Sequence, residues 1–220
     1  MSLADEGGLI WYLDAHGDVL NSISPVTGTP SLTPISLDPD GASLASAGGV
    51  LWAVAAITTF DTDRLYRIDP QKRTVQKSTD FQNVLQMPVV VAGEGAVWVA
   101  DGALKKFDPG TLESLEQIGV EESRPDYVAT GGGAVWVASA GGNAYRIDPA
   151  TDVIDATITL GGQPSGIAVG PNAVWVADAR GSLFRIDPKT NKLVKKYKVG
   201  SSPSAVALSP TAVLVVAQTF

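Results

Sequence analysis

The sequence predicts an all-β protein, specifically a β-propeller built of four-stranded antiparallel blades. The first observation is a tryptophan that recurs five times at a nearly regular spacing, with Leu214 at the sixth equivalent place. The five positions are Trp11, Trp52, Trp98, Trp136 and Trp175. Their period, about 40 residues, is typical of one propeller blade. The second observation is a series of short segments rich in valine, isoleucine and aromatic residues, bounded by glycine, proline and aspartate. Thirdly, no segment has the apolar spacing of a helix.

Each repeat contains four candidate strands in the same order. The first reads PSGIAVG at 164–170 and is echoed at 88–93, 125–131 and 203–209, and the second reads AVWVA. The third reads SLFRID and the fourth LVKKYKV. Because AVWVA is apolar throughout, we expect it to be buried on both faces between neighbouring blades. Val97 and Val99 should face one neighbour, and Trp98 and Ala100 the other.

A recurring Asp-Pro pair ends the third strand and predicts a tight turn. It occurs at Asp69, Asp108, Asp148 and Asp187, and Ser24 precedes Pro25 in the first repeat. Aspartate or serine at the first turn position accepts a backbone hydrogen bond, and the proline restricts the φ angle that follows. The Thr-Gly, Thr-Asp and Thr-Asn pairs that follow tolerate positive φ. We therefore interpret these aspartates as hairpin residues rather than catalytic ones.

The repeats divide the whole chain, residues 1–220, as one propeller domain with segments at about 8–40, 41–86, 87–123, 124–162 and 163–201 and a partial copy at 202–220. Counting candidate strands gives about twenty-one, one more than five blades need. We expect five blades, with the first strand at 203–209 joining the N-terminal set at 9–35. Six blades, or a fragment of a larger ring, are the alternatives.

Composition excludes several classes of function. The 220 residues carry a net charge of −7, which disfavours nucleic-acid binding because that mode needs a broad basic surface. The absence of cysteine excludes disulfides and thiol chemistry. No apolar run reaches the roughly 18 residues of a membrane helix, so no membrane insertion is expected, and the N-terminus MSLADEGG does not read as a signal peptide.

AVWVAD followed by a short loop and L-x-RIDP-x-T resembles the NHL/YVTN class of β-propeller repeats, including the streptogramin-lyase-like group. The resemblance covers nearly the whole chain, from Gly8 to Ala217. Similar repeats occur in extracellular sensor domains of receptor kinases and in secreted or periplasmic binding propellers, which implies an extracytoplasmic setting. The lyases of the group are expected to use histidine, glutamate and a divalent metal. Here His16 is the only histidine, so the sequence departs from that pattern.

Function is expected where the copies differ, in loops that leave the second strand or enter the first. The candidate ligand- or partner-facing residues are Asp14, His16, Phe60, Asp61, Asp63, Asp101, Arg124, Ser139, Gln163, Asp178 and Arg180. No metal site is assigned, although Asp14, Asp101 and Asp178 could converge on a cation, since carboxylates suit hard metals. The alternative is that each bonds nearby backbone. Lys192, Lys195, Lys196 and Lys198 are interpreted as protection of an outer strand edge.

These observations favour a non-catalytic propeller that binds a protein or small molecule over its central channel, as a sensor or interaction domain of a larger protein. No cofactor or catalytic residue is expected, and self-association through unpaired terminal strands is possible. The alternative is a metal-dependent lyase- or lactonase-like enzyme using Asp14, Asp101 and Asp178. A quinone-cofactor propeller is disfavoured because the chain is short for such large rings.

Overall fold

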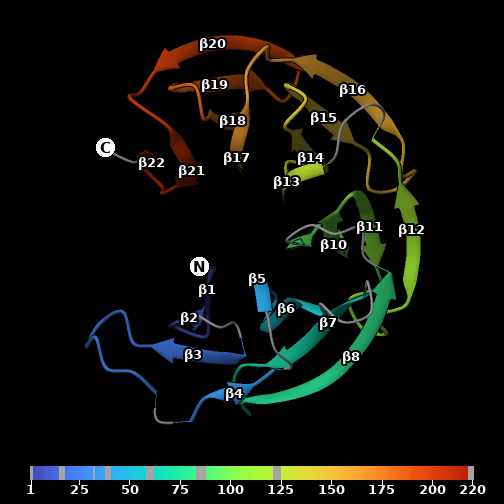
Figure 1. Ribbon diagram of the computed structural model, residues 1–220, viewed down its shortest axis with the longest axis vertical. Helices are drawn as coiled ribbons and strands as arrows, with labels where there is room; N and C mark the ends of the chain where they lie inside the picture. The colour runs from blue at the N-terminus through green and yellow to red at the C-terminus, as the bar shows by residue number, and fades with distance from the viewer. Residues whose placement is uncertain are drawn as a thin grey trace. The chain divides into compact units, whose positions relative to one another are not determined.

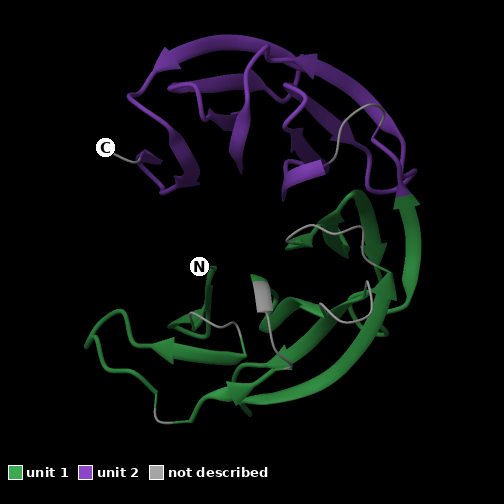
Figure 2. Ribbon diagram, in the orientation of Figure 1, with its two compact units in different colours: residues 1–117 green, residues 118–220 purple. Residues whose placement is uncertain are grey.

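The computed structural model describes residues 2–14, 18–31, 33–37, 41–57, 62–82, 88–120 and 125–217, with only the backbone of 41 and 42. Within these ranges every regular element is a β-strand, so the prediction of an all-β chain without helices is confirmed. The described residues accordingly include no helix able to cross a membrane. Two compact units, residues 1–117 and 118–220, are coloured separately in Figure 2.

The first unit contains three four-stranded antiparallel sheets, in which each strand pairs with the next along the chain (Figure 1). Sheet 1 comprises β1 (Leu3–Glu6), β2 (Leu9–Leu13), β3 (Val19–Ile23) and β4 (Ile35–Ser36). Sheet 2 comprises β5 (Gly41–Ala47), β6 (Val50–Ile57), β7 (Thr62–Asp69) and β8 (Thr74–Gln82). Sheet 3 comprises β9 (Val89–Gly93), β10 (Ala96–Asp101), β11 (Ala103–Phe107) and β12 (Ser114–Ile118), which ends one residue into the second unit.

The second unit contains two four-stranded sheets and a two-stranded one. Sheet 4 comprises β13 (Pro125–Gly131), β14 (Ala134–Ser139), β15 (Asn143–Ile147) and β16 (Ile154–Thr159). Sheet 5 comprises β17 (Pro164–Gly170), β18 (Ala173–Asp178), β19 (Ser182–Asp187) and β20 (Lys192–Lys198). Sheet 6 comprises β21 (Pro203–Leu208) and β22 (Val213–Ala217). Five four-stranded sheets and one two-stranded sheet are consistent with a propeller-like arrangement.

The expected closure of the N-terminal sheet is wrong. The strand β1, within MSLADEGG, pairs with β2, so sheet 1 has its own first strand and does not take β21, which pairs with β22. The turn Gly7-Gly8, with φ of 63° and 74°, joins β1 to β2 as a hairpin turn that needs positive φ at both positions. This short strand was overlooked because it is half charged and only Ala4 of its side chains is buried.

The second strands of sheets 2, 3 and 4 are buried on both faces, as predicted, and their alternate side chains face opposite neighbours. In the first unit Trp52 and Val54 of β6 pack in one cluster with Val97 and Val99 of β10. In the second unit Trp136 and Ala138 of β14 pack in the same way against Val174 and Val176 of β18. The even and odd positions of one strand therefore serve two different interfaces, which explains the uninterrupted apolar sequence.

Three of the tryptophans, Trp11, Trp52 and Trp136, are packed in one cluster with residues of the third strand of the following sheet. Trp11 shares a cluster with Tyr66 and Ile68 of β7, and Trp136 shares one with Phe184 and Ile186 of β19. Trp52 lies with Phe107 of β11 and with Leu112 in the turn after it. Trp11 and Trp136 are 0% exposed and Trp52 is 4% exposed. A buried indole is a large apolar surface, so each of these three side chains contributes strongly to its interface.

The Asp-Pro turns are confirmed as hairpins with a shared backbone. The first residue's side chain accepts amide hydrogen bonds two and three residues ahead, as in the 2.8 Å and 2.7 Å bonds from Gly110 and Thr111 to Asp108 Oδ1. Ser24 Oγ accepts the corresponding bonds from Val26 and Thr27. The fifth residue has positive φ in all five turns: Gly28, Arg73, Leu112, Asp152 and Asn191.

We predict that Trp136→Ala lowers the free energy of unfolding by about 3–5 kcal/mol, because it opens a large cavity between two sheets. Trp175→Ala should cost roughly half as much, since Trp175 is only half-buried. Urea unfolding of the two variants measures the difference. Equal losses would contradict the packing described above.

The turn carboxyls should also make stability depend on pH. The pKa values of Asp69, Asp108 and Asp187 lie below the usual range, chiefly because the amides of Lys72, Thr111 and Lys189, respectively, donate hydrogen bonds to them. A pKa lowered by folding adds stability that is present above the unfolded value, about 3.9, and is lost as pH falls through the folded value. The triple variant D69N/D108N/D187N should therefore lose less stability between pH 7 and pH 3 than the unmodified chain, as measured by urea unfolding at both pH values. An unchanged pH dependence would refute this assignment.

Candidate functional site

One of the candidate carboxylates is bound to a buried lysine. Asp101, at the end of β10, is 0% exposed, and its Oδ2 lies 2.7 Å from Lys105 Nζ. Lys105 Nζ also donates to the carbonyl oxygen of Gln82 at 2.8 Å and lies 5.0 Å from the ring centroid of Phe81. This pair joins sheets 2 and 3, which gives Asp101 a structural partner.

Lys105 was missed by the sequence interpretation, although the repeat contained the signal. The residue pairs with Val99, one position after Trp98. In sheets 2, 4 and 5 the equivalent place is taken by Tyr66, Tyr145 and Phe184, respectively. A lysine in a place otherwise aromatic needs a buried counter-charge, and Asp101 supplies it.

A second candidate carboxylate holds a loop together. Asp178, at the end of β18, is 0% exposed, and its Oδ1 accepts hydrogen bonds from the amides of Gln163 at 2.8 Å and Arg180 at 3.2 Å. Three of the predicted site residues thus come together in the second unit. Asp178 Oδ2 is buried and has no hydrogen-bond partner within the described ranges. The carboxylate ties the entry of β17 to the exit of β18.

The remaining predicted residues occupy different settings. Asp14 is half-buried and its Oδ1 accepts the amide of Val19 at 3.4 Å. Ser139 is the last residue of β14 and is 0% exposed. Asp63, expected in a loop, lies in β7 opposite Ala56 and is buried, because β6 extends to Ile57 and β7 begins at Thr62. His16, Phe60, Asp61 and Arg124 lie outside the described residues.

The described residues do not support the hypothesis of a metal site at the aspartates. Asp14 follows β2, Asp101 is the last residue of β10 and Asp178 is the last residue of β18. Among the residues that the structure describes, no three histidine, cysteine, aspartate or glutamate side chains gather as a metal-binding group. Each of the three carboxylates instead has the nearby partner described above.

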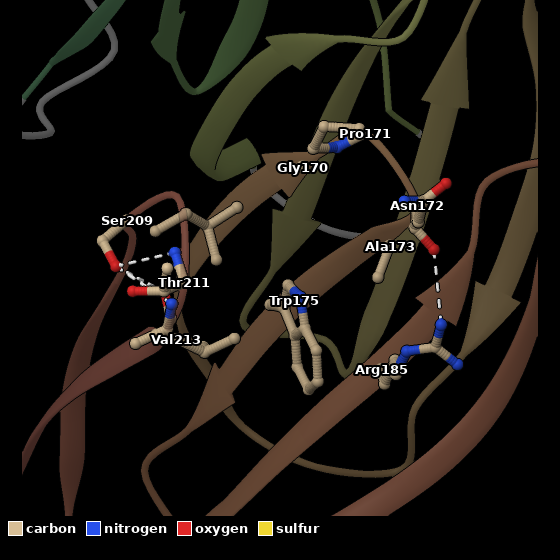
Figure 3. A pocket seen from close by; sticks show the side chains of 11 residues that line it. Gly170, Pro171, Asn172, Ala173, Trp175, Arg185, Ser209, Thr211 and Val213 are labelled. Atoms are coloured by element: carbon tan, nitrogen blue, oxygen red, sulfur yellow. Dashed lines mark hydrogen bonds between the residues drawn. The ribbon is translucent and has the colours of Figure 1, made fainter.

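A pocket that the sequence interpretation missed lies in the second unit, between sheets 5 and 6 (Figure 3). Its volume is about 320 Å³, at the lower end of ligand-binding pockets. Trp175 of β18 lies in its wall, with Gly170, Asn172 and Ala173 on one side and Leu208, Ser209 and Val213 on the other. The pocket therefore exposes an aromatic ring that the other interfaces cover.

A cation lies beside this ring. The guanidinium carbon of Arg185, on β19, is 6.0 Å from the centroid of the Trp175 ring, and Tyr197 of β20 packs against the same indole with centroids 5.8 Å apart. Arg185 Nη2 donates to the carbonyl oxygen of Asn172 over 3.4 Å, a long hydrogen bond. The pocket thus combines an open aromatic face with a partly exposed guanidinium, which suits an apolar group carrying an oxygen acceptor.

Trp175 and Arg185 were not among the predicted site residues, because both recur from copy to copy and function was expected where the copies differ. What distinguishes them is the sheet that follows. Sheet 6 comprises two strands in the described part of the chain, so it offers no third strand to cover Trp175 there. The sequence signal was AVLVV at 212–216, which occupies the place of AVWVA without a third strand assigned after it.

Comparisons with known proteins identify the fold but no family. No model of a known protein family matches the sequence, and no curated protein matches it. Among solved structures, the crystal structure of the computationally designed Ika8 protein is similar, with a TM-score of 0.73 and 14% sequence identity. The similarity covers 98% of this chain and 67% of the designed one. At this identity it shows a shared fold alone.

We predict that Asp101→Asn lowers the free energy of unfolding by about 3–5 kcal/mol, because it leaves the charge of Lys105 buried without its counter-charge. The double variant D101L/K105M should lose much less, since neither charge remains. Urea unfolding of the single and double variants provides the comparison. A double variant as unstable as D101N would contradict the assignment of Asp101 as the counter-ion.

Proposed function

We propose that the chain is a non-catalytic binding domain, a β-propeller of the NHL/YVTN kind, that recognises a protein or small-molecule ligand as a sensor or interaction module. The observation that carries the proposal is the Trp175–Arg185 pocket, where an indole is partly exposed. The tryptophans at equivalent places in sheets 1 to 4 are at most 4% exposed. An aromatic ring beside an arginine is typical of a residue pair that contributes strongly to binding.

The candidate carboxylates support the non-catalytic character of this proposal. The Asp101 carboxylate binds the ammonium group of Lys105, and the Asp178 carboxylate accepts hydrogen bonds from two backbone amides. A lyase- or lactonase-like reaction at Asp14, Asp101 and Asp178 would require the Asp101 carboxylate to leave Lys105. No described contact favours that alternative, so one function is proposed.

A thermal-shift screen of peptides, aromatic carboxylates, sugars and divalent metal ions tests the proposal. A ligand at a hundredfold excess over its Kd should stabilise the protein by about 2.7 kcal/mol, and W175A and R185Q should abolish the shift. The matched control L115S changes an exposed apolar residue of β12, 51% exposed, and should keep it. Ligand binding that is unaffected by W175A, or metal-dependent turnover of a lactone, would overturn the proposal.

A further inference from the structure

A second pocket lies in the second unit, at β15 and β16 of sheet 4. Its volume is about 660 Å³, within the range of ligand-binding pockets. Asn143 and Tyr145 of β15 and Thr157 of β16 line it, together with Asp152 and Val153 of the Asp-Pro turn. All its lining residues fall within 118–157, so the pocket shares none with the Trp175 pocket and does not involve sheet 6.

The strand register places the polar residues of this pocket on one face of the sheet. Tyr145 pairs directly with Thr157, and Asn143 lies two positions before Tyr145 on the same strand. Directly paired residues share a face, as do residues two positions apart. Asn143 Nδ2 donates a hydrogen bond to Tyr145 Oη over 3.3 Å. The wall of the pocket is therefore a continuous row of amide and hydroxyl groups.

This polar row is a departure from the repeat. The place of Asn143 is taken by Ala103 in sheet 3 and by Ser182 in sheet 5. The place of Tyr145 is taken in sheet 5 by Phe184, which has no hydroxyl group. The pairing of an amide with a tyrosine hydroxyl thus has no counterpart in sheets 3 and 5, and a difference between copies is where function is expected.

A buried hydroxyl beside Asn143 also has unused hydrogen-bonding capacity. Ser139 pairs directly with Asn143, so the two side chains share a face. Ser139 Oγ is buried and has no hydrogen-bond partner among the described residues. The equivalent residues of sheets 3 and 5, Asp101 and Asp178, bind a lysine and backbone amides. An unpartnered buried hydroxyl is unfavourable and calls for an explanation such as a polar group at this end of the face.

The charges and polar groups of the pocket restrict what it can bind. Its described lining contains no lysine or arginine and one carboxylate, that of Asp152, so an anion would meet a like charge without a counter-charge. Asn143, Tyr145 and Thr157 offer donors and acceptors together, which suits a hydroxyl group because it also donates and accepts. Ile118 adds an apolar surface. These features match a neutral molecule with many hydroxyl groups and some C–H surface.

From these observations we infer that the pocket at β15 and β16 binds a neutral saccharide. The sugar hydroxyls form hydrogen bonds with the amide and hydroxyl groups of the polar row, and the C–H surface of the sugar ring packs against Ile118 and Val153. The inference goes beyond the proposed function, because this second site needs neither Trp175 nor Arg185.

Ligand-observed NMR titrations of the full chain with maltose, cellobiose, lactose and chitobiose test the inference. At least one of these neutral disaccharides should bind with a Kd of about 1 mM or below. N143A and Y145F should each weaken that binding about tenfold, because each removes a group that bonds the sugar. Both variants should fold, since alanine and phenylalanine occupy these places in sheets 3 and 5.

Two control variants should leave the affinity for the sugar unchanged. S182A alters the place in sheet 5 that corresponds to Asn143, so it is matched to N143A. R185Q alters the Trp175 pocket, so it separates the two sites.

The inference is overturned if none of the four disaccharides binds, if N143A and Y145F leave the affinity unchanged, or if S182A weakens binding as much as N143A does. Binding of a disaccharide that is lost in R185Q and kept in N143A would also overturn it. In that case the sugar binds at the Trp175 pocket, so the second site fails while the proposed binding function stands.

Discussion

The fold depends on one recurring contact, in which a tryptophan of one sheet's second strand is covered by the third strand of the next sheet. Trp11, Trp52 and Trp136 show this contact within their units, and their cover comes from aromatic and aliphatic residues at matching positions. A single sheet cannot bury such a side chain by itself. The contact therefore makes sheets 1, 2 and 4 each depend on the sheet that follows.

Departures from the repeat are compensated locally. Lys105 occupies a place that is aromatic in three other sheets, and Asp101 and the Gln82 carbonyl bind its ammonium group. Arg73 has positive φ, which is unfavourable for arginine, but its guanidinium binds Ser22 Oγ at 3.1 Å and lies 4.6 Å from the Trp11 ring centroid. Leu112 has the same backbone strain and is 1% exposed. In each case a contact between sheets offsets the local cost.

The regular part of the structure could be predicted from the sequence because it is repeated. Tryptophan spacing predicted the sheets, and Asp-Pro predicted the turns. The strand β1 could not be recognised by hydrophobicity, since its place depends on pairing with β2 and on the Gly7-Gly8 turn. The Asp101–Lys105 pair and the Trp175 pocket were also missed. Both depend on which residues face each other across the interface between two sheets, and residue types alone do not predict those neighbours.

The same reasoning explains why the candidate site differs from the predicted one. For the aspartates at strand ends, the sequence left open a ligand or bonds to nearby backbone; Asp178 accepts backbone amides, and Asp101 binds Lys105, and both are fully buried. The residues now favoured, Trp175 and Arg185, are repeat residues whose neighbour has changed. The pocket at Trp175 arises because the neighbouring sheet has two described strands, not because the residue types differ from those of the other sheets.

The most direct test of the stacking contact is the solvent exposure of each indole ring in the unmodified protein. A soluble nitroxide in an NMR experiment broadens the signals of exposed rings and leaves covered rings sharp. We expect strong broadening of Trp175 and little change for Trp11, Trp52 and Trp136. Broadening of Trp136 to the same extent as Trp175 would contradict the claim that the third strand of the following sheet covers Trp136.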